Sequence, residues 1–194
     1  MKKIVILTST RAEYGLLAPI IKKMSKNSLI DVCVVATGTH LSPEFGMTVN
    51  EIKNDGVKVD KEIDILLSSD TPVAISKTMG LAMIGFGDYF AESKPDVLMV
   101  LGDRYETLAV CIAAMNARIP IIHLHGGEAT EGLVDEAVRN AITKLSYLHF
   151  TSTEEYRNRV IQMGEAPERV FAVGAMGVEN ALHMKRLSKK ELED

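Results

Sequence analysis

Short runs of apolar, mostly β-branched residues alternate along the whole chain with longer helical patterns, and this alternation constrains the fold most. The runs at which we expect strands are residues 4–7, 32–36, 57–59, 97–101, 119–123, 149–151 and 170–173. The segments at which we expect helices are residues 14–26, 51–54, 72–92, 105–117, 135–145 and 154–163. Strands that alternate with helices pair in parallel through right-handed crossovers. The pattern therefore predicts an α/β protein with a doubly wound parallel sheet.

Composition excludes several classes of protein. The chain has 194 residues, of which 46% are hydrophobic and 25% charged, as in a soluble globular domain. Its net charge is −4 and no basic stripe is present, so we expect no nucleic-acid partner. No apolar run approaches the roughly 18 residues of a membrane helix, and no signal peptide is recognisable. We expect no membrane contact, a cytoplasmic location, and buried reduced thiols at Cys33 and Cys111.

The last residues indicate where a domain ends. Ser188 and Glu191 have the spacing of a helix capping box, yet the chain stops at Asp194. We therefore expect residues 1–182 to form one domain and residues 183–194 to begin a linker or the next helix. On this interpretation the chain is the front part of a longer protein.

Polar residues follow several of the expected strands. Ligands of a doubly wound sheet bind beyond the carboxyl ends of its strands. The polar segments at those ends are residues 8–11, 38–40, 102–104 and 123–128. We expect them to meet on one rim, where ionisable side chains form a site without entering the core.

Arg11 and His40 are the first candidates on that rim. Arg11 lies between a strand and a helix that we expect to open at a Gly15 turn, a place suited to binding phosphate. A solvated surface arginine is the equally weighted alternative. His40 is either a ligand contact or, more simply, a hydrogen-bonded loop histidine.

Asp103 is the next candidate. Asp103 either caps the following helix or faces a ligand. Gly102 before it favours the second alternative, because a glycine lets the backbone approach a bound ligand closely. We expect the neighbouring Arg104 to keep the Asp103 carboxylate ionised.

His123, His125 and Glu128 raise the possibility of a metal site. Alternate residues of a strand face opposite sides, and no further ligand set is evident, so we favour no metal. The preferred interpretation is a glycine-rich turn through which His125 and Glu128 reach a substrate. Asp135 and Arg139, four residues apart on the next helix, form either a surface ion pair or part of the same rim.

Several common motifs of this fold class are missing. The turn after the first strand, at residues 8–15, has no G-x-G-x-x-G pattern, which disfavours a dinucleotide-binding dehydrogenase. The sequence also has no P-loop and no G-x-S-x-G elbow. The chemistry must therefore come from other motifs.

Five motifs, in order and with compatible spacing, resemble one known family. They are Thr10-Arg-Ala-Glu-Tyr-Gly15, Gly38-Thr-His40, Gly102-Asp-Arg104, His123-Leu-His-Gly-Gly-Glu128 and Thr130-Glu-Gly-Leu-Val-Asp-Glu136, followed by Arg139 and Ile142-Thr-Lys144. The chain resembles the hydrolysing UDP-N-acetylglucosamine 2-epimerases from residue 1 to about residue 181. The resemblance implies the N-terminal, Rossmann-like half of a GT-B fold, a UDP-sugar substrate in the cleft, and no cofactor.

The implied reaction eliminates UDP across C1–C2 of the sugar and adds water to the glycal, which releases N-acetylmannosamine. By motif position, Asp103 and Asp135 match acidic residues assigned to the reaction, and Arg11 matches a residue near the diphosphate. Arg104, Arg139 and His40 are further substrate-binding candidates. The sequence departs from the family where His125 replaces a catalytic Glu, so either His125 or Glu128 takes that role. A related UDP-linked diacetamido-trideoxyhexose therefore stays open as the substrate.

Two other functions stay open, namely half of a GT-B glycosyltransferase and a non-catalytic sugar-nucleotide-binding domain. The density of ionisable groups on one rim disfavours the second. We also expect a homodimer or homotetramer, because the helical segment 73–90 has more apolar surface than one sheet face requires. Ordinary core packing of that segment is the equally weighted alternative.

Overall fold

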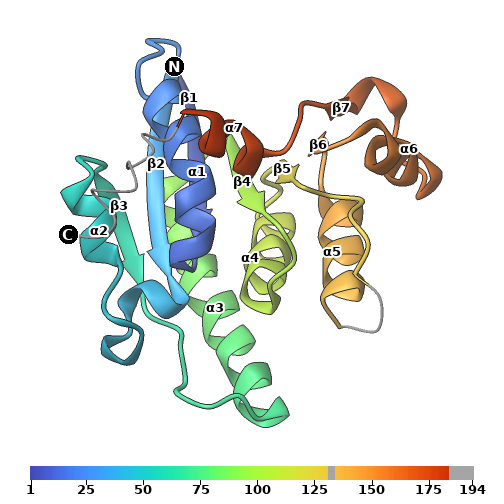
Figure 1. The fold of residues 1–194 in the computed structure, drawn as a ribbon. Coiled ribbons are helices and arrows are strands. Elements are labelled where there is room, and N and C mark those ends of the chain that lie inside the picture. The colour runs from blue at the N-terminus through green and yellow to red at the C-terminus, as the bar shows by residue number, and fades with distance from the viewer. Residues whose placement is uncertain (131–133, 184–194) are drawn as a thin grey trace, which may run out of the picture.

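A seven-stranded sheet forms the centre of the computed structural model, which describes residues 1–130 and 134–183. All of its strand pairs are parallel, and the strand order is β3-β2-β1-β4-β5-β6-β7 (Figure 1). The strands are β1 (Lys2–Thr8), β2 (Ile30–Thr37), β3 (Val59–Ile63), β4 (Val97–Leu101), β5 (Ile121–Leu124), β6 (Leu148–Thr151) and β7 (Val170–Ala172). The doubly wound α/β fold predicted from the sequence is confirmed.

Helices cover both faces of this sheet. They are α1 (Arg11–Met24), α2 (Val49–Asn54), α3 (Pro72–Ser93), α4 (Tyr105–Asn116), α5 (Val134–Leu145), α6 (Glu154–Gln162) and α7 (Met176–His183). Short 3-10 turns are η1 (Gly38–Leu41), η2 (Pro43–Phe45) and η3 (Pro167–Arg169). In Figure 1, α1 and α7 lie in front of the strands, whereas α3, α4 and α5 lie on the far side.

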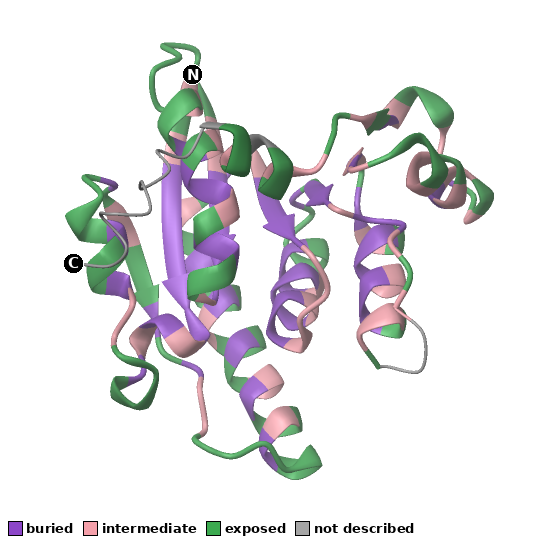
Figure 2. Cartoon of the chain, viewed as in Figure 1, coloured by how far each residue is buried: buried purple, intermediate pink, exposed green. Residues whose placement is uncertain are grey.

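Neighbouring residues of each central strand enter different cores. Val5 packs with α3, α4 and α5, whereas Ile6 packs with α1 and α2. Leu98 and Met99 divide between the same two clusters. Because both faces are covered, β4 and the inner parts of β1 and β2 are apolar instead of alternating, and Figure 2 shows them as buried.

The winding direction of the sheet reverses between β1 and β4. From β1 the chain moves outward to β2 and β3, and then returns to place β4 on the other side of β1. The loops after β1 and β4 therefore diverge, which leaves a crevice at their carboxyl ends. The fold thus leaves a crevice at the edge of the sheet where the sequence predicts the rim.

Most element boundaries agree with the sequence within a few residues, but three differ in instructive ways. Helix α1 begins at Arg11 rather than Tyr14, because Thr10 and Glu13 form a reciprocal capping box, and Gly15 lies inside the helix instead of in a turn. Strand β3 starts at Val59, since Val57 is buried in the connection from α2. Helix α7 was not predicted. The capping box at Ser188 lies outside the described residues, and the domain boundary after residue 182 stays a prediction.

Helix α3 exposes several large apolar side chains. Phe86 and Phe90 are buried against the sheet, whereas Val73, Leu81, Met83 and Ile84 are exposed. No helix that the structure describes is both long and apolar enough to span a bilayer. Self-association through the outer face of α3 stays a prediction.

Replacing Ile84 with Asp tests that prediction. Ile84 is 66% exposed, so the charge should leave the fold intact but prevent two α3 surfaces from associating. Sedimentation velocity should show a smaller species for Ile84→Asp than for the unmodified protein. Leu29→Asp, at an exposed apolar residue between α1 and β2, is the matched control. A monomeric unmodified protein would refute self-association.

Candidate active site

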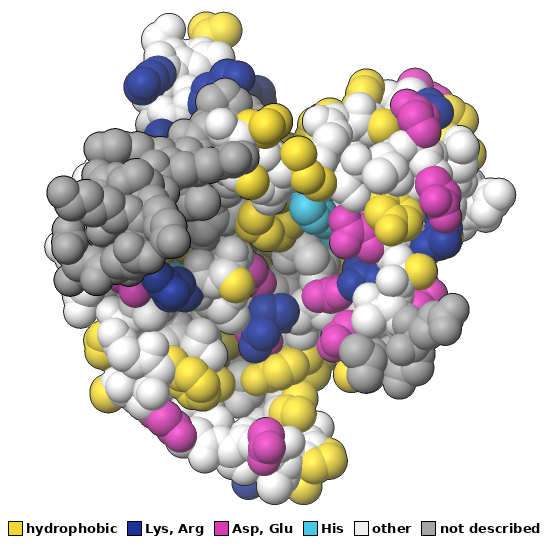
Figure 3. Space-filling view, viewed as in Figure 1, with side chains coloured by type: hydrophobic (Ala, Val, Ile, Leu, Met, Phe, Trp, Pro, Cys, Tyr) yellow, Lys and Arg dark blue, Asp and Glu magenta, His cyan; other side chains and the backbone are white. Residues whose placement is uncertain are grey.

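A cavity of about 290 Å³ lies at the carboxyl ends of β1, β4 and β5. We call it the rim pocket; its lining residues are Thr10, Ala12, Glu13, Leu16, Leu101, Gly102, Asp103, Arg104, His125, Glu128 and Arg139. Figure 3 shows acidic, basic and histidine side chains gathered in the hollow at the centre of this face. The structure therefore brings together most of the residues that the sequence analysis selected.

Arg139 ties one side of the rim pocket together. Its guanidinium forms an ion pair with Asp103, donates to the Glu128 carbonyl oxygen at 2.7 Å, and donates to Thr130 Oγ1 at 3.1 Å. Only 5% of Arg139 is exposed, and its planar guanidinium holds the loop after β4 against the loop after β5.

The alternative of an ion pair between Asp135 and Arg139 is wrong, because Arg139 turns inward to Asp103. Asp135 is half-buried in the first turn of α5, one turn before Arg139, and does not line the rim pocket. It lies at the same end of the sheet as Asp103, since Arg139 joins α5 to that residue.

Asp103 has a different partner from the one expected. The N-cap of α4 is Arg104 and no side chain caps it, so Asp103 is not a helix cap. Arg104 turns away from Asp103 and pairs through Nε with the buried carboxylate of Glu106. The expected pairing of Arg104 with Asp103 is therefore wrong, and Arg139 forms the ion pair with Asp103 instead.

His125 and Glu128 form a pair at the end of β5. His125 Nδ1 lies 3.2 Å from Glu128 Oε1, and Ser152 Oγ donates to that oxygen at 2.8 Å. His125 Nε2 is buried and has no hydrogen-bond partner among the described residues. Burial lowers the pKa of His125, while the Glu128 carboxylate acts to raise it. His125 therefore lines the rim pocket with an imidazole ring whose Nδ1 faces a carboxylate and whose Nε2 is unpaired.

The glycines after His125 shape this turn. Gly127 has φ +80°, and a Cβ there would lie 2.4 Å from the Tyr156 carbonyl oxygen. Only glycine allows α6 to approach this closely. His125 itself has φ +64°, a left-handed conformation that is uncommon for a residue with a side chain.

His123 is a buried structural residue. Its ring nitrogens lie 2.8 Å from the Gly102 carbonyl oxygen and 3.1 Å from Thr143 Oγ1. Burial lowers its pKa to about 4. Among residues 1–130 and 134–183, no three His, Cys, Asp or Glu side chains are grouped to hold a metal ion.

Arg11 and His40 do not line the rim pocket. The Arg11 side chain is 73% exposed and pairs with Glu51 on α2 at 2.8 Å, which corrects its expected position in a turn. His40 is fully buried between Thr8 Oγ1 at 2.9 Å and Thr48 Oγ1 at 2.8 Å, and burial lowers its pKa to about 4. The structure therefore favours the hydrogen-bonded loop histidine of the two alternatives.

Three residues that were not candidates from the sequence lie at the rim pocket: Glu13 lines it, and Ser9 and Glu106 contact each other next to Glu13. Ser9, Glu13 and Glu106 are buried, and the hydroxyl of Ser9 contacts both carboxyl groups. The T-x-x-E spacing of the α1 capping box was a signal that could have identified Glu13. Glu106 lies on the apolar helix α4, where only the structure reveals its partner.

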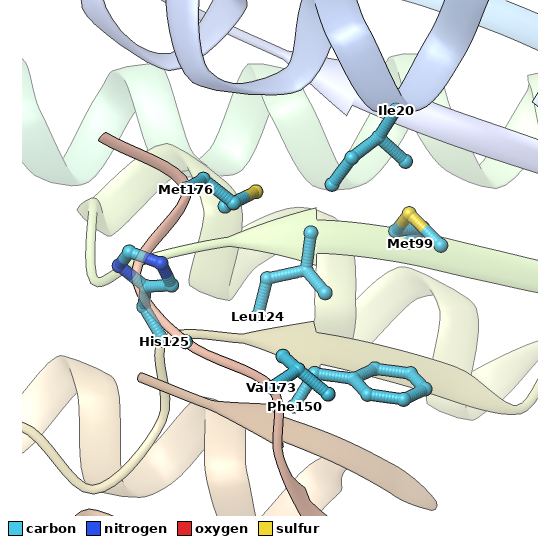
Figure 4. A pocket seen from close by; sticks show the side chains of 8 residues that line it. Ile20, Met99, Leu124, His125, Phe150, Val173 and Met176 are labelled. Carbon is cyan, nitrogen blue, oxygen red and sulfur yellow. The ribbon is translucent and has the colours of Figure 1, made fainter. Parts of the chain in front are cut away.

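A second, apolar cavity of about 230 Å³ adjoins His125 on the side of α1 and α7. Figure 4 shows Met176 beside the His125 ring and Leu124, Phe150 and Val173 around the opening. His125 therefore lines both this apolar cavity and the charged rim pocket.

The sequence and the fold both match known proteins. The family model described as UDP-N-acetylglucosamine 2-epimerase matches residues 22–194. The hydrolysing GDP/UDP-N,N'-diacetylbacillosamine 2-epimerase of Campylobacter jejuni is 42% identical, over 99% of this chain and 50% of that protein. The hydrolysing UDP-N,N'-diacetylbacillosamine 2-epimerase of Legionella pneumophila is 43% identical, over 95% of this chain and 49% of that protein.

A solved structure gives the same result. The UDP-GlcNAc 2-epimerase of Neisseria meningitidis, bound to UDP-GlcNAc, superposes with a TM-score of 0.81 at 25% identity. The match covers 94% of this chain and 49% of that one. This chain therefore spans about half the length of these relatives and has the fold of one Rossmann-like half of their GT-B structure.

The buried histidines predict how stability depends on pH. The folded-state pKa of His40 and of His123 is about 4, below the value of about 6.5 for a free histidine. Between these values the unfolded chain binds more protons, so the free energy of unfolding should fall as the pH drops from about 6.5 towards 4. We expect each histidine to contribute on the order of 2 kcal/mol to that loss.

Urea unfolding at several pH values measures the effect. His123→Gln should be less stable at neutral pH and should show a smaller difference between pH 7 and pH 5. Asn180→Gln, on α7, adds no titratable group and keeps an amide that can donate to the Gly15 carbonyl oxygen, so this control should keep the full dependence. An unfolding free energy that does not change between these pH values would contradict the assignment.

Proposed function

This chain belongs to the UDP-N-acetylglucosamine 2-epimerase family, and we propose that it supplies the sugar-side catalytic groups of a hydrolysing UDP-sugar 2-epimerase. The proposed reaction breaks the C2–H and C1–O bonds of the sugar, expels UDP and leaves a glycal. Water then adds across the double bond to give the free sugar with the opposite configuration at C2. Such a reaction needs a base, a cationic group near the leaving phosphate, and a group that activates water.

The observation that carries the proposal is the unpaired Nε2 of His125. Glu128 lies against Nδ1, so it favours the tautomer in which Nδ1 carries the proton and Nε2 keeps its lone pair. Burial lowers the pKa of His125, which keeps the ring neutral near pH 7. Nε2 of His125 is therefore our candidate for the base that removes the C2 proton.

Arginine and carboxylate groups around the same pocket suit the other requirements. Arg104 supplies a cation at the mouth of the rim pocket, where the leaving diphosphate would develop charge. Asp103 is held by Arg139 and is 26% exposed, so it can orient a sugar hydroxyl or a water molecule. We propose that Asp135, at the start of α5, acts in the later addition of water.

The relatives favour a particular class of sugar. The Campylobacter and Legionella proteins, which are 42% and 43% identical to this chain, are both named for diacetylbacillosamine. The Neisseria protein, named for UDP-GlcNAc, is 25% identical in the matched structure. We therefore propose a UDP-linked 2,4-diacetamido-trideoxyhexose as the preferred substrate, with UDP-GlcNAc, which would yield N-acetylmannosamine, as the weaker alternative.

Product analysis in deuterated water tests the reaction. The full-length protein, incubated with either UDP-sugar and no acceptor, should release UDP together with a 2-epimeric free sugar. NMR should find deuterium at C2, because the proton removed from the substrate exchanges with solvent before addition is complete. No release of UDP until an acceptor is added would instead indicate a glycosyltransferase, and binding without turnover would indicate a non-catalytic domain.

The pH profile tests the role of His125. Only the neutral His125 ring accepts a proton, and burial lowers its pKa. The pH at which kcat/KM falls on the acid side of the profile should therefore lie below the usual histidine pKa of about 6.5. Glu128→Gln removes the carboxylate that raises the pKa, so this pH should move further to the acid side. His125→Ala should lower kcat by about 10²–10⁴-fold.

Glu62→Gln, in the exposed ion pair between β3 and Lys53, is the control for a change from carboxyl to amide. It should leave the pH profile where it is. An acid limb that Glu128→Gln does not move would argue against the His125–Glu128 pair as the base.

A further inference from the structure

The turn of residues 125–128, which carries the candidate base, is held by β6 and by the helix that follows it. The His125 backbone N–H donates to the Phe150 carbonyl oxygen at 2.8 Å, which continues the pairing of β5 with β6. Arg159 Nη1, on α6, donates to the Gly127 carbonyl oxygen at 3.0 Å. The backbone of α6 also packs directly against Gly127. The position of the turn therefore depends on β6 and α6.

Ser152 joins this scaffold to the carboxylate that contacts His125. Ser152 follows β6 directly and precedes Thr153, whose side chain caps the N-terminus of α6. Ser152 Oγ donates to Glu128 Oε1 at 2.8 Å, and the same oxygen lies 3.2 Å from His125 Nδ1. Because Ser152 lies between a paired strand and a capped helix, its backbone has little freedom to move away from Glu128.

The hydrogen-bonding capacity of these three side chains fits one arrangement of protons. An ionised carboxylate only accepts, and each of its oxygens can accept more than one hydrogen bond. Glu128 Oε1 can therefore accept from the Ser152 hydroxyl and from the His125 ring at the same time. His125 Nδ1 then carries the proton of the neutral ring, which leaves the lone pair on Nε2. Both donors meet at one oxygen, and neither lacks an acceptor.

Ser152 limits the freedom of the Glu128 side chain. That side chain is 31% exposed, so a carboxylate without a partner could turn towards water. Within the described part of the chain, the carboxylate contacts Ser152 and His125, whereas Arg139 contacts the Glu128 backbone. A hydrogen bond from a hydroxyl to a charged oxygen is one of the stronger kinds, so it can fix the direction of the carboxylate.

We propose that Ser152 is a positioning residue, whose hydroxyl holds the Glu128 carboxylate against His125 Nδ1 and thereby keeps the lone pair of the ring on Nε2. A carboxylate has the same effect on the imidazole of a Ser-His-Asp triad, which it holds in the productive tautomer. Ser152 acts through Glu128 and does not touch the sugar. The tautomer of His125 follows from the contacts alone, whereas its importance for a sugar rests on the function proposed above.

Nitrogen NMR of the imidazole rings tests the tautomer without any turnover. In the full-length protein, labelled with ¹⁵N in histidine, His125 at neutral pH should have a protonated Nδ1 and an unprotonated Nε2. Its signals are those that disappear in His125→Ala. Ser152→Ala should move part of the His125 population to the tautomer with the proton on Nε2, whereas Ser152→Thr, which keeps the hydroxyl, should not.

Two results of this measurement would overturn the proposal. The first is a His125 ring that carries its proton on Nε2 in the unmodified protein. The second is a set of His125 signals that Ser152→Ala leaves unchanged. Ser76→Ala is the matched control, since the exposed Ser76 hydroxyl on α3 also makes one hydrogen bond, to the Pro72 carbonyl oxygen at 2.8 Å. It should leave the His125 signals as they are.

Kinetics test whether the contact serves the reaction. Ser152→Ala removes a hydrogen bond to a charged group but no group that contacts the substrate. It should therefore lower kcat for the UDP-sugar about 10-fold, with a smaller change in KM. Ser152→Thr should keep most of kcat, and Ser76→Ala should keep all of it. An unchanged kcat in Ser152→Ala would contradict the positioning role.

A double-variant cycle separates positioning from a general loss of structure. If Ser152 acts through Glu128, Ser152→Ala should have little further effect on kcat once Glu128→Ala has removed the carboxylate. Independent effects of the two substitutions would show that Ser152 acts elsewhere and would refute the proposal.

The outcomes also separate this inference from the proposed function. If Ser152→Ala changes the His125 tautomer while the unmodified protein releases no UDP, the proposed reaction fails and the positioning of His125 by Ser152 stands. If the protein epimerises the sugar but Ser152→Ala changes neither the tautomer nor kcat, the proposed reaction stands and the positioning role is wrong.

Discussion

A parallel sheet with helices on both faces leaves only the ends of its strands for charged groups. The centre of the sheet obeys that constraint, since Val5, Ile6, Leu98 and Met99 enter two apolar cores and no Asp, Glu, Lys or Arg lies within residues 4–8 or 97–101. At the carboxyl ends of β1, β4 and β5, arginines and carboxylates then meet at short range. The chemistry proposed for this epimerase family member follows from the point at which the sheet reverses its winding.

Local sequence signals predicted the elements well where one physical cause dominates. The run at residues 97–101 is apolar because it is buried on both faces, and the structure confirms it as β4 without a change in its bounds. Pro72 is at the first position of α3, as its fixed φ favours. The start of α1 was misplaced because Gly15 was read as a turn, although the capping box at Thr10 starts the helix earlier. Helix α7 follows a glycine at position 174 and was missed.

The site was predictable as a group of residues but not as a set of partners. The motifs predicted that Asp103, His125, Glu128 and Arg139 lie on one rim. In the structure all four line the rim pocket. Which charge pairs with which depends on side-chain directions that only packing decides, so Arg139 holds Asp103 while Arg104 turns to Glu106. The sequence pattern did not predict that Glu106 is buried, because a glutamate on an apolar helix can be buried or exposed. Only the packing around it decides between the two.

The left-handed backbone at His125 has an evolutionary consequence. A residue with a side chain at φ +64° carries about 1 kcal/mol or more of backbone strain that a glycine would not have. Replacing His125 with glycine should therefore raise the free energy of unfolding. A library of variants selected for thermal tolerance alone should therefore drift towards glycine or asparagine at this position. Histidine should be retained at position 125 only in a population that is also selected for catalytic activity. The residue at this position therefore indicates whether a related sequence is still selected for activity.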